Sequence, residues 1–357
     1  MSKKILCIID ANLNRAREGI RVIEDLVRFY TCEKKLCAEL KEIRHSISKA
    51  ANLIAPLSEL AKARAYSIDV GKEAYTKSEG LREGLGNIIS ANTIRVAEAL
   101  RVLEEFSKLY NPKAGKKFKE IRMKIYVIEQ QLLHKISKER LMENFKGAEL
   151  YAIIDSRFSF GKSYESLAKA AIKGGAKIIQ LRDKVLSTKK LIGIGIKIKE
   201  LCAKKSVLFI VNDRVDIALA IDADGVHLGQ EDMPTKTARK ILGPEKIIGY
   251  STHSLQQAKA VDASVVDYIS VGPIFATQSK PQYKAVGLKF IKKVRKAVKL
   301  PFVAIGGIKP ENAKDVIRSG AGRVAVITAI SEAKNPVAAT KGLLRKIRET
   351  KKKRKNK

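Results

Sequence analysis

Several residue types that mark particular protein classes are scarce in this chain of 357 residues. It has no tryptophan, and its aromatic fraction is only 6%. Its four cysteines suggest neither a disulfide framework nor a paired CxxC metal motif. No apolar run approaches the ~20 residues of a membrane-spanning helix, and Asp10 interrupts the apolar stretch at the N-terminus. These absences predict a soluble protein of the reducing cytoplasm without structural zinc.

Acidic residues are also few, which raises nucleic-acid binding as one hypothesis. The chain has 71 lysines and arginines against 37 aspartates and glutamates, a formal net charge of +34. The excess is spread along the whole chain, and aromatic side chains that could stack on bases are rare. A lysine-rich solvated surface is therefore favoured over a nucleic-acid groove. Residues 351–357 are predicted to form a disordered basic tail.

From residue 149 onward the chain contains eight short β-rich runs separated by amphipathic helical segments. The cores of the runs are mostly apolar, which is typical of strands buried on both faces. The runs cover residues 149–155, 176–184, 206–213, 225–229, 246–252, 268–274, 301–307 and 323–330. Eight βα units in about 200 residues predict an α/β fold, a TIM (β/α)8 barrel over residues 149–350. A doubly wound open sheet is the structural alternative.

Residues 1–138 show helical periodicity, little strand signal and an internal repeat. Segment 11–30 returns 80 residues later as 91–110, and the motif KEIR at 41–44 returns at 119–122. Two copies of a helical hairpin predict an antiparallel helical bundle with pseudo-twofold symmetry, followed by a linker at 139–148. Asn12 and Asn92 occupy the same position in the two copies and are expected to be N-caps.

The repeat keeps charged residues in register, among them Arg15 with Arg95 and Glu18 with Glu98. Residues three positions apart lie on one helical face. Because surface charges need not match between copies, we expect these four side chains to meet across the pseudo-twofold axis. Two arrangements stay open: a buried ion-pair network, or a pocket whose arginines bind a phosphorylated ligand.

The site of a TIM barrel lies at the carboxyl ends of its strands, and here those ends are polar. The residues there include Gln180, Arg182, Asp183, Lys184, Asn212, Asp213, Asp232, Ser251, Thr277, Ser279 and Lys280. The last two predicted strands end at Gly307 and at Ile327 and Thr328, where TIM barrels often bind phosphate. One substrate is therefore expected to carry a phosphate.

Asp213 and Asp232 follow neighbouring predicted strands, where two carboxylates could share Mg²⁺ with a substrate phosphate. Helix capping is the alternative, because each aspartate precedes a helical segment. Arg182, Lys184 and Lys280 at the same rim favour a combined anion and metal site. Such a site suits diphosphate chemistry, in which metal and cations stabilise charge on a leaving group.

The ordered motifs QLRDK, VNDR, GVHLGQED, IGYSTHS, SVGPIFATQSK, AVGL, AIGGI and VITAIS resemble thiamine-phosphate synthase over the whole predicted barrel. The resemblance implies that an aminopyrimidine diphosphate is joined to a thiazole phosphate, giving thiamine phosphate and diphosphate with Mg²⁺ as cofactor and no protein nucleophile. Two positions depart from the usual motifs, since Asp183 replaces a glutamate and Ser279 a threonine; both substitutions keep the functional group.

The same resemblance assigns residues to each ligand. The pyrimidine diphosphate would be bound by Gln180, Leu181, Arg182, Asp183, Lys184, Asn212, Ser251 and Lys280, with Lys280 and Ser251 as catalytic residues. The thiazole phosphate would be bound by Thr277, Ser279, Gly307, Ile327 and Thr328, and the metal by Asp213 and Asp232.

Two further alternatives come from resemblance. Thiazole tautomerase is similar to the synthase in fold but has lost the pyrimidine site, so the full set of Asp213, Asp232 and Lys280 favours the synthase. Residues 1–138 resemble the helical domain fused ahead of thiamine-phosphate synthases in some bacteria, which implies a kinase for hydroxymethylpyrimidine phosphate. The segment has no Walker loop or glycine-rich kinase loop, so a kinase and a scaffold stay open, as does a homo-oligomer.

Overall fold

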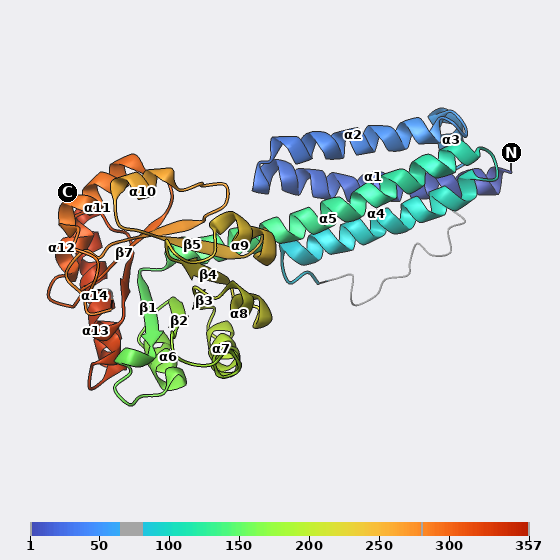
Figure 1. Ribbon diagram of the computed structural model, residues 1–357. Coiled ribbons are helices and arrows are strands. Elements are labelled where there is room, and N and C mark those ends of the chain that lie inside the picture. The colour runs from blue at the N-terminus through green and yellow to red at the C-terminus, as the bar shows by residue number, and fades with distance from the viewer. Residues whose placement is uncertain (1, 65–80, 280, 356–357) are drawn as a thin grey trace. The chain divides into compact units, whose positions relative to one another are not determined.

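The computed structural model describes residues 2–64, 81–279 and 281–355, and it divides into two compact units, residues 1–136 and 137–357 (Figure 1). Helix α5 (Pro112–Gly147) continues through the boundary between the units. The predicted linker at 139–148 is therefore helical up to residue 147, which corrects that prediction. No described helix combines the length and the apolar character that a membrane span requires.

The second unit contains eight parallel strands that pair in sequence order and close into a barrel (Figure 1). They are β1 (Leu150–Asp155), β2 (Ile178–Arg182), β3 (Leu208–Asn212), β4 (Gly225–Leu228), β5 (Ile247–Thr252), β6 (Tyr268–Val271), β7 (Phe302–Ile305) and β8 (Val324–Val326). The TIM-barrel prediction is confirmed. The open-sheet alternative is wrong, because β1 pairs with β8, Leu150 opposite Val324.

Successive side chains of each strand point alternately into and out of the barrel. In β1, Tyr151 and Ile153 belong to the apolar cluster inside the barrel. Ala152 and Ile154, between and after them, belong to the larger cluster that lies between the strands and the surrounding helices. This alternation decides which residues of a strand can reach a pocket inside the barrel.

The last turns of α5 close the amino-terminal end of the barrel. Phe145 is fully buried, and its ring centroid lies 4.4 Å from that of Tyr268, the first residue of β6. Arg323 donates from Nε to the Phe145 carbonyl (2.8 Å) and from Nη2 to the Lys146 carbonyl (2.7 Å). These bonds satisfy carbonyls that the end of a helix leaves unpaired. The segment predicted as a linker is thus ordered by its packing against the barrel.

Helices surround the strands (Figure 1). They are α6 (Tyr164–Lys173), α7 (Thr188–Ala203), α8 (Val215–Ala220), α9 (Thr235–Leu242), α10 (Leu255–Ala260), α11 (Gly287–Ala297), α12 (Ala313–Arg318), α13 (Thr328–Ser331) and α14 (Pro336–Lys355). Their apolar faces cover the outside of the barrel. Cys202 on α7, for example, is fully buried in this layer.

Helix α14 includes most of the segment predicted to be a disordered tail. Lys351 Nζ lies 3.0 Å from Glu149 Oε1, and Arg354 Nη1 donates to the Ile317 carbonyl at 3.1 Å. Because these contacts join the helix to the barrel, the prediction of disorder is wrong for residues 351–355. Residues 356 and 357 lie outside the described residues.

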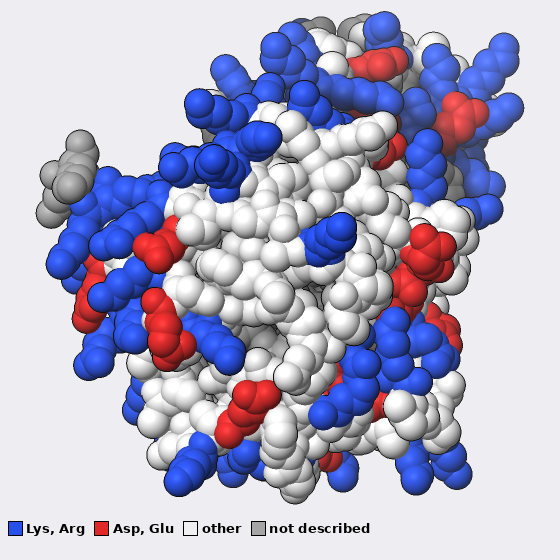
Figure 2. All heavy atoms as spheres, turned by 60° about the vertical axis from the view of Figure 1, so that its left-hand side comes forward, with Lys and Arg blue, Asp and Glu red and all other residues white. Residues whose placement is uncertain are grey.

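Positive charge is distributed widely over the face that Figure 2 shows. Figure 2 shows the face on the side of α10 to α14, where Lys and Arg side chains surround a largely uncharged centre and outnumber Asp and Glu. They form no single continuous band on this face. This distribution favours the solvated lysine-rich surface over a nucleic-acid groove.

All regular elements among the described residues of the first unit are helices. It contains α1 (Lys3–Leu26), a π-helical turn (Val27–Thr31), α2 (Lys34–Ala51), α3 (Leu57–Lys62), α4 (Leu85–Ser107) and the first part of α5. Helices α1 and α4, which carry the repeated segment, pack against each other. A Cβ atom on Gly19 would overlap Val96 Cγ2, so glycine is needed at this close approach.

Asn12 and Asn92 lie inside α1 and α4 rather than at their beginnings. Each donates from Nδ2 to the carbonyl four residues earlier, Ile8 at 2.9 Å and Ile88 at 2.8 Å. The N-cap prediction is therefore wrong, because both helices begin well before the asparagines, at Lys3 and Leu85.

The repeat produces matched ion pairs between helices. Glu24 and Glu104 are buried, with 5% and 4% of their surface exposed. Arg44 Nε lies 3.2 Å from Glu24 Oε2, and Arg122 Nη2 lies 2.7 Å from Glu104 Oε2. Since both arginines come from the repeated KEIR motif, each copy of the repeat encodes one ion pair that joins two helices.

We predict that Phe145→Ala destabilises the barrel by about 3–5 kcal/mol, the usual cost of truncating a buried aromatic side chain. The measurement is the denaturant midpoint of the barrel transition. Phe160→Ala is the matched control, because Phe160 is 59% exposed in the same unit, and it should shift the midpoint little. Equal shifts for the two variants would show that Phe145 does not close the barrel.

Candidate active site

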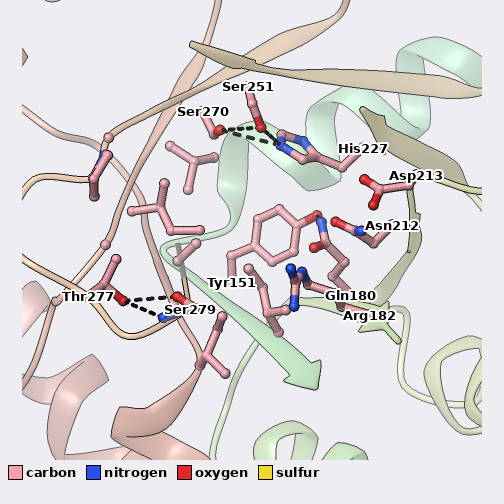
Figure 3. Close-up of a pocket in the computed structure, with 18 of the residues that line it drawn as sticks. Tyr151, Gln180, Arg182, Asn212, Asp213, His227, Ser251, Ser270, Thr277 and Ser279 are labelled. Atoms are coloured by element: carbon pink, nitrogen blue, oxygen red, sulfur yellow. Dashed lines mark hydrogen bonds between the residues drawn. The ribbon is translucent and has the colours of Figure 1, made fainter. Parts of the chain in front are cut away.

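A pocket lies at the carboxyl ends of the barrel strands (Figure 3). Many of the predicted site residues line it: Gln180, Arg182, Lys184, Asn212, Asp213, Asp232, Ser251, Thr277, Ser279 and Ile327. They come from β2 to β8 and the loops that follow these strands. The fold therefore brings together side chains that are widely separated in the sequence.

Other predicted residues lie elsewhere. The Leu181 side chain is buried in the outer apolar layer, because it alternates with the inward-pointing Gln180 and Arg182, so the expectation that it contacts substrate is wrong for its side chain. Gly307 and Thr328 do not line the pocket but adjoin Gly306 and Ile327, which do. Lys280 lies outside the described residues.

Asp183 organises the loop after β2. Its Oδ1 accepts hydrogen bonds from the backbone N–H groups of Val185 (2.7 Å) and Leu186 (2.5 Å), and its Oδ2 accepts one from Tyr164 Oη (2.5 Å). Burial opposes ionisation of this carboxyl, but these donors together lower its pKa. Asp183 does not line the pocket, so these contacts give it a structural role, and its predicted contact with a ligand stays a prediction.

Asp213 and Asp232 form a pair of interacting carboxylates at the pocket rim. Burial raises the pKa of Asp213, and the neighbouring Asp232 raises it further. Lys184 Nζ, 3.2 Å from Asp213 Oδ2, acts in the opposite direction. Asp213 also adopts a left-handed backbone with φ of 60°, an unusual conformation for a residue other than glycine. The structure thus holds two acids together at some cost in free energy.

Helix capping does not account for this pair. The N-cap of α8 is Arg214 and that of α9 is Pro234, and neither helix has a side-chain cap. Asp232 Oδ2 instead accepts the Gly229 N–H at 2.6 Å, a bond within the loop after β4.

Two cationic side chains lie on the same side of the pocket as the acids. Arg182 is buried and forms an ion pair with Asp155, at the end of β1. Lys184 is half exposed and extends toward Asp213. Because Arg182 is fixed by a buried partner, its guanidinium is oriented before any ligand binds.

Small polar groups lie on another side of the pocket (Figure 3). Thr277 Oγ1 and Ser279 Oγ are 2.9 Å apart in the loop after β6. Gly306 in the loop after β7 has φ of 100°, and a Cβ atom there would overlap Pro273. Glycine is therefore required where this backbone approaches the pocket.

The inner end of the pocket contains residues that were not predicted to contact a ligand. Tyr151, Tyr268 and Ser270 line it from inside the barrel, together with His227. His227 Nε2 lies 3.0 Å from Ser251 Oγ, and His227 Nδ1 lies 3.0 Å from Tyr268 Oη. The prediction considered residues at strand ends, whereas these tyrosines stand near the start of β1 and β6. Their inward orientation follows only from the alternation within each strand.

The four charged residues predicted from the repeat do not form a buried network. Arg15, Glu18, Arg95 and Glu98 are exposed. That expectation is wrong because the buried ion pairs of the repeat are made by Glu24 and Glu104 with partners from the KEIR motifs. The alternative, a ligand pocket at these four residues, stays a hypothesis.

Both units of the chain match known protein families. Residues 150–330 match the family model described as thiamine monophosphate synthase, and residues 7–131 match the ThiD2 family. The thiamine-phosphate synthase of Synechocystis sp. (strain ATCC 27184 / PCC 6803 / Kazusa) is 39% identical over 340 residues, 95% of each chain. That of Nostoc punctiforme is 40% identical over 344 residues, 96% of this chain and 94% of that one.

A solved structure agrees with these matches. Thiamine phosphate pyrophosphorylase from Pyrococcus furiosus is 39% identical, with a TM-score of 0.54, and the match covers 58% of this chain and 98% of that one. The curated relatives extend over both units, so the helical unit is part of the shared chain architecture. The chain belongs to the thiamine-phosphate synthase family and is an enzyme of thiamine biosynthesis.

Proposed function

We propose that the barrel joins 4-amino-2-methyl-5-(diphosphooxymethyl)pyrimidine to 4-methyl-5-(2-phosphooxyethyl)thiazole, releasing diphosphate and giving thiamine phosphate. In this reaction the bond between the pyrimidine methylene carbon and the diphosphate oxygen breaks, and its electron pair leaves with the diphosphate. The lone pair of the thiazole nitrogen forms the new carbon–nitrogen bond. The family membership supports this reaction, and the relatives named thiamine-phosphate synthase favour it over a tautomerase.

The observation that carries the proposal is the separation of polar groups within one pocket (Figure 3). Arg182, Lys184, Asp213 and Asp232 provide charge on one side, which suits a diphosphate with its cation. Thr277 and Ser279 provide hydroxyl groups on another, which suits a phosphate monoester. A pocket with two such regions can hold both substrates at once.

The pair Asp213 and Asp232 fits Mg²⁺. Burial and mutual repulsion raise the pKa of Asp213, and a divalent cation shared by the two carboxylates would offset this repulsion. The described residues contain no cluster of three or more His, Cys, Asp or Glu that could hold a metal alone. Mg²⁺ commonly uses one or two carboxylates with substrate phosphates and water completing its octahedron. When bound, it would neutralise charge on the leaving diphosphate.

The chain's own cations would bind and orient the diphosphate. Arg182, held by Asp155, presents a fixed guanidinium, and Lys184 adds a flexible positive charge. Positive charge placed beside a leaving group stabilises the transition state more than the ground state. Lys280 lies outside the described residues and keeps its proposed role as a further cation for the diphosphate.

On the thiazole side, the pocket offers Thr277 and Ser279 with the backbone at Gly306. Hydroxyl and backbone N–H donors bind a phosphate without competing for the metal. Gly307, Ile327 and Thr328 adjoin this region and remain proposed contacts of the thiazole phosphate.

The direct test supplies the full chain with both phosphorylated precursors and Mg²⁺ and measures thiamine phosphate and diphosphate. We expect the two products in equal amounts. A folded protein that forms neither product would contradict the proposal. Tautomerisation of the thiazole alone would support the alternative barrel activity.

For the metal pair we predict that Asp213→Asn abolishes most of the Mg²⁺-dependent activity while raising the melting temperature of the metal-free protein at neutral pH. The raised pKa of Asp213 means that the folded state favours the protonated carboxyl. The stability that the protonated Asp213 carboxyl gives the folded protein is therefore complete at pH values below the pKa of this group in the unfolded chain. It is lost as pH rises through the pKa of Asp213 in the folded protein. In Asp213→Asn the side-chain amide carries no charge at neutral pH, so this loss of stability does not occur.

The matched control for this prediction is Asp216→Asn. Asp216 is exposed on α8, and its hydrogen bond with Arg214 lowers its pKa, so the amide should not raise the melting temperature. Activity should stay near that of the parent. The metal assignment fails if Asp213→Asn keeps full activity and Mg²⁺ still raises the melting temperature.

For the thiazole side we predict that Thr277→Val raises KM for the thiazole phosphate about tenfold or more, because a hydrogen bond to a charged group is lost. KM for the pyrimidine diphosphate should change little. Thr237→Val is the control, since Thr237 is exposed on α9 and outside the pocket. Steady-state kinetics with the opposite selectivity would mean that the two substrate regions are exchanged.

A further inference from the structure

A chain of hydrogen bonds crosses the inner end of the pocket from β2 to β5. Gln180 Nε2 donates to Tyr151 Oη at 2.7 Å, and Tyr151 Oη lies 3.1 Å from Tyr268 Oη. Tyr268 Oη lies 3.0 Å from His227 Nδ1, and His227 Nε2 lies 3.0 Å from Ser251 Oγ. All five side chains are at least nine-tenths buried. The chain therefore connects two pocket residues, Gln180 and Ser251, through three side chains.

The amide at one end is compatible with a single direction along the whole chain. Burial raises the pKa of Tyr151 and of Tyr268, so both phenols keep their hydrogens, and each has one to donate. Tyr151 accepts from the Gln180 amide, and in the arrangement in which every group both accepts and donates, it gives its own hydrogen to Tyr268. In the same arrangement Tyr268 accepts from Tyr151 and donates to His227 Nδ1.

The direction continues through the imidazole. A ring that accepts at Nδ1 carries its hydrogen on Nε2, which donates to Ser251 Oγ. Ser270 Oγ lies 3.3 Å from His227 Nε2 and donates to Ser251 Oγ at 3.5 Å. In this arrangement the Ser251 oxygen accepts from His227 Nε2 and Ser270 Oγ, and the Ser251 hydrogen is directed toward the pocket. Ser251 is thereby a hydrogen-bond donor to whatever ligand lies there.

Gly249 makes this arrangement possible. A Cβ atom at this position of β5 would overlap the Tyr268 phenol and the His227 imidazole. Since φ of Gly249 is not in the left-handed region, its backbone does not require glycine. The space is needed for the contact between Tyr268 and His227.

We propose that Tyr268, acting through His227, is a positioning residue that makes Ser251 a donor to an acceptor atom of the pyrimidine substrate. The identity of that substrate rests on the proposed function, whereas the direction of the chain does not. At the other end of the chain, the Gln180 side chain donates from Nε2 to Tyr151, and its amide oxygen Oε1 is an acceptor. The two ends of the chain then offer one donor and one acceptor to a nitrogen heterocycle, as an aminopyrimidine requires.

This direction also distinguishes the site from that of a serine hydrolase. In a catalytic triad a carboxylate accepts from the histidine, whose other nitrogen then removes the serine proton. Here a neutral tyrosine donates to the histidine, so Nε2 already carries a hydrogen and cannot accept one from Ser251. The contact between Ser251 and His227 is therefore compatible with a reaction that uses no protein nucleophile.

The first test is the ¹⁵N NMR spectrum of the imidazole nitrogens in the substrate-free protein. We expect His227 to carry its hydrogen on Nε2, with the signal assigned by its loss in His227→Gln. In Tyr268→Phe the hydrogen should move wholly or partly to Nδ1. Wild-type protein with the hydrogen on Nδ1 would overturn the proposal, and this result does not depend on any enzymatic activity.

The second test is a double-mutant cycle in kcat/KM for the pyrimidine diphosphate. Tyr268→Phe keeps the ring that packs on Phe145 and should lower kcat/KM about tenfold, and Ser251→Ala should lower it at least as much. The double variant should match Ser251→Ala alone, because both changes remove the same donor. Additive losses would contradict the proposal.

The matched control is Tyr110→Phe, the same substitution in the helical unit. It should leave kcat/KM and the His227 signal unchanged. Failure of the proposed function would appear as a wild-type protein that forms no thiamine phosphate. The positioning proposal fails if the enzyme is active and His227 of the wild-type protein carries its hydrogen on Nδ1. It also fails if the losses in kcat/KM of Tyr268→Phe and Ser251→Ala are additive in the double variant.

Discussion

Closure of the eight-stranded barrel is the constraint on which the rest of the structure depends. The pairing of β1 with β8 places the first and last strands side by side, although they are separated by most of the barrel sequence. Since all strands are parallel, their carboxyl ends surround one opening, and the residues that follow them must meet there. At the other end, Phe145 packs against Tyr268 and closes the barrel interior. The pocket therefore has an open polar end and a closed aromatic end.

The pocket concentrates groups that would be unfavourable elsewhere. Asp213 has a left-handed backbone and a raised pKa, both of which cost stability at neutral pH. Arg182 is buried with Asp155, an arrangement that serves orientation more than stability. A binding site for a diphosphate and its cation needs charges of both signs held in place before the ligand arrives. The barrel supplies the rigidity that keeps them there.

The helical unit uses charge in a different way. Its buried acids, Glu24 and Glu104, each pair with an arginine of a KEIR motif on another helix. Removing one member of such a pair would leave an uncompensated buried charge, which is strongly destabilising. This explains why these charges recur in both copies of the repeat. The matched Arg15 and Arg95 are exposed, so the same explanation does not extend to them.

The sequence by itself determined the barrel. Apolar runs at regular intervals have few alternatives to a parallel sheet, and all eight strands lie where the runs predict them. The polar residues at the strand ends could also be found, because the topology alone brings Asp213 and Asp232 to one rim. The helical repeat was likewise visible in the pattern.

Only the tertiary structure decided which side chains face one another. Leu181 and Gln180 are neighbours in the sequence, yet one is buried under the helices and the other lines the pocket, because strand side chains alternate. The contacts among Tyr151, Tyr268 and His227 join three strands and depend on the register between them. Similarly, the burial of Glu24 and the exposure of Arg15 depend on how α1 packs. A periodic pattern specifies an element and its faces, but the partner of each face is specified only by packing.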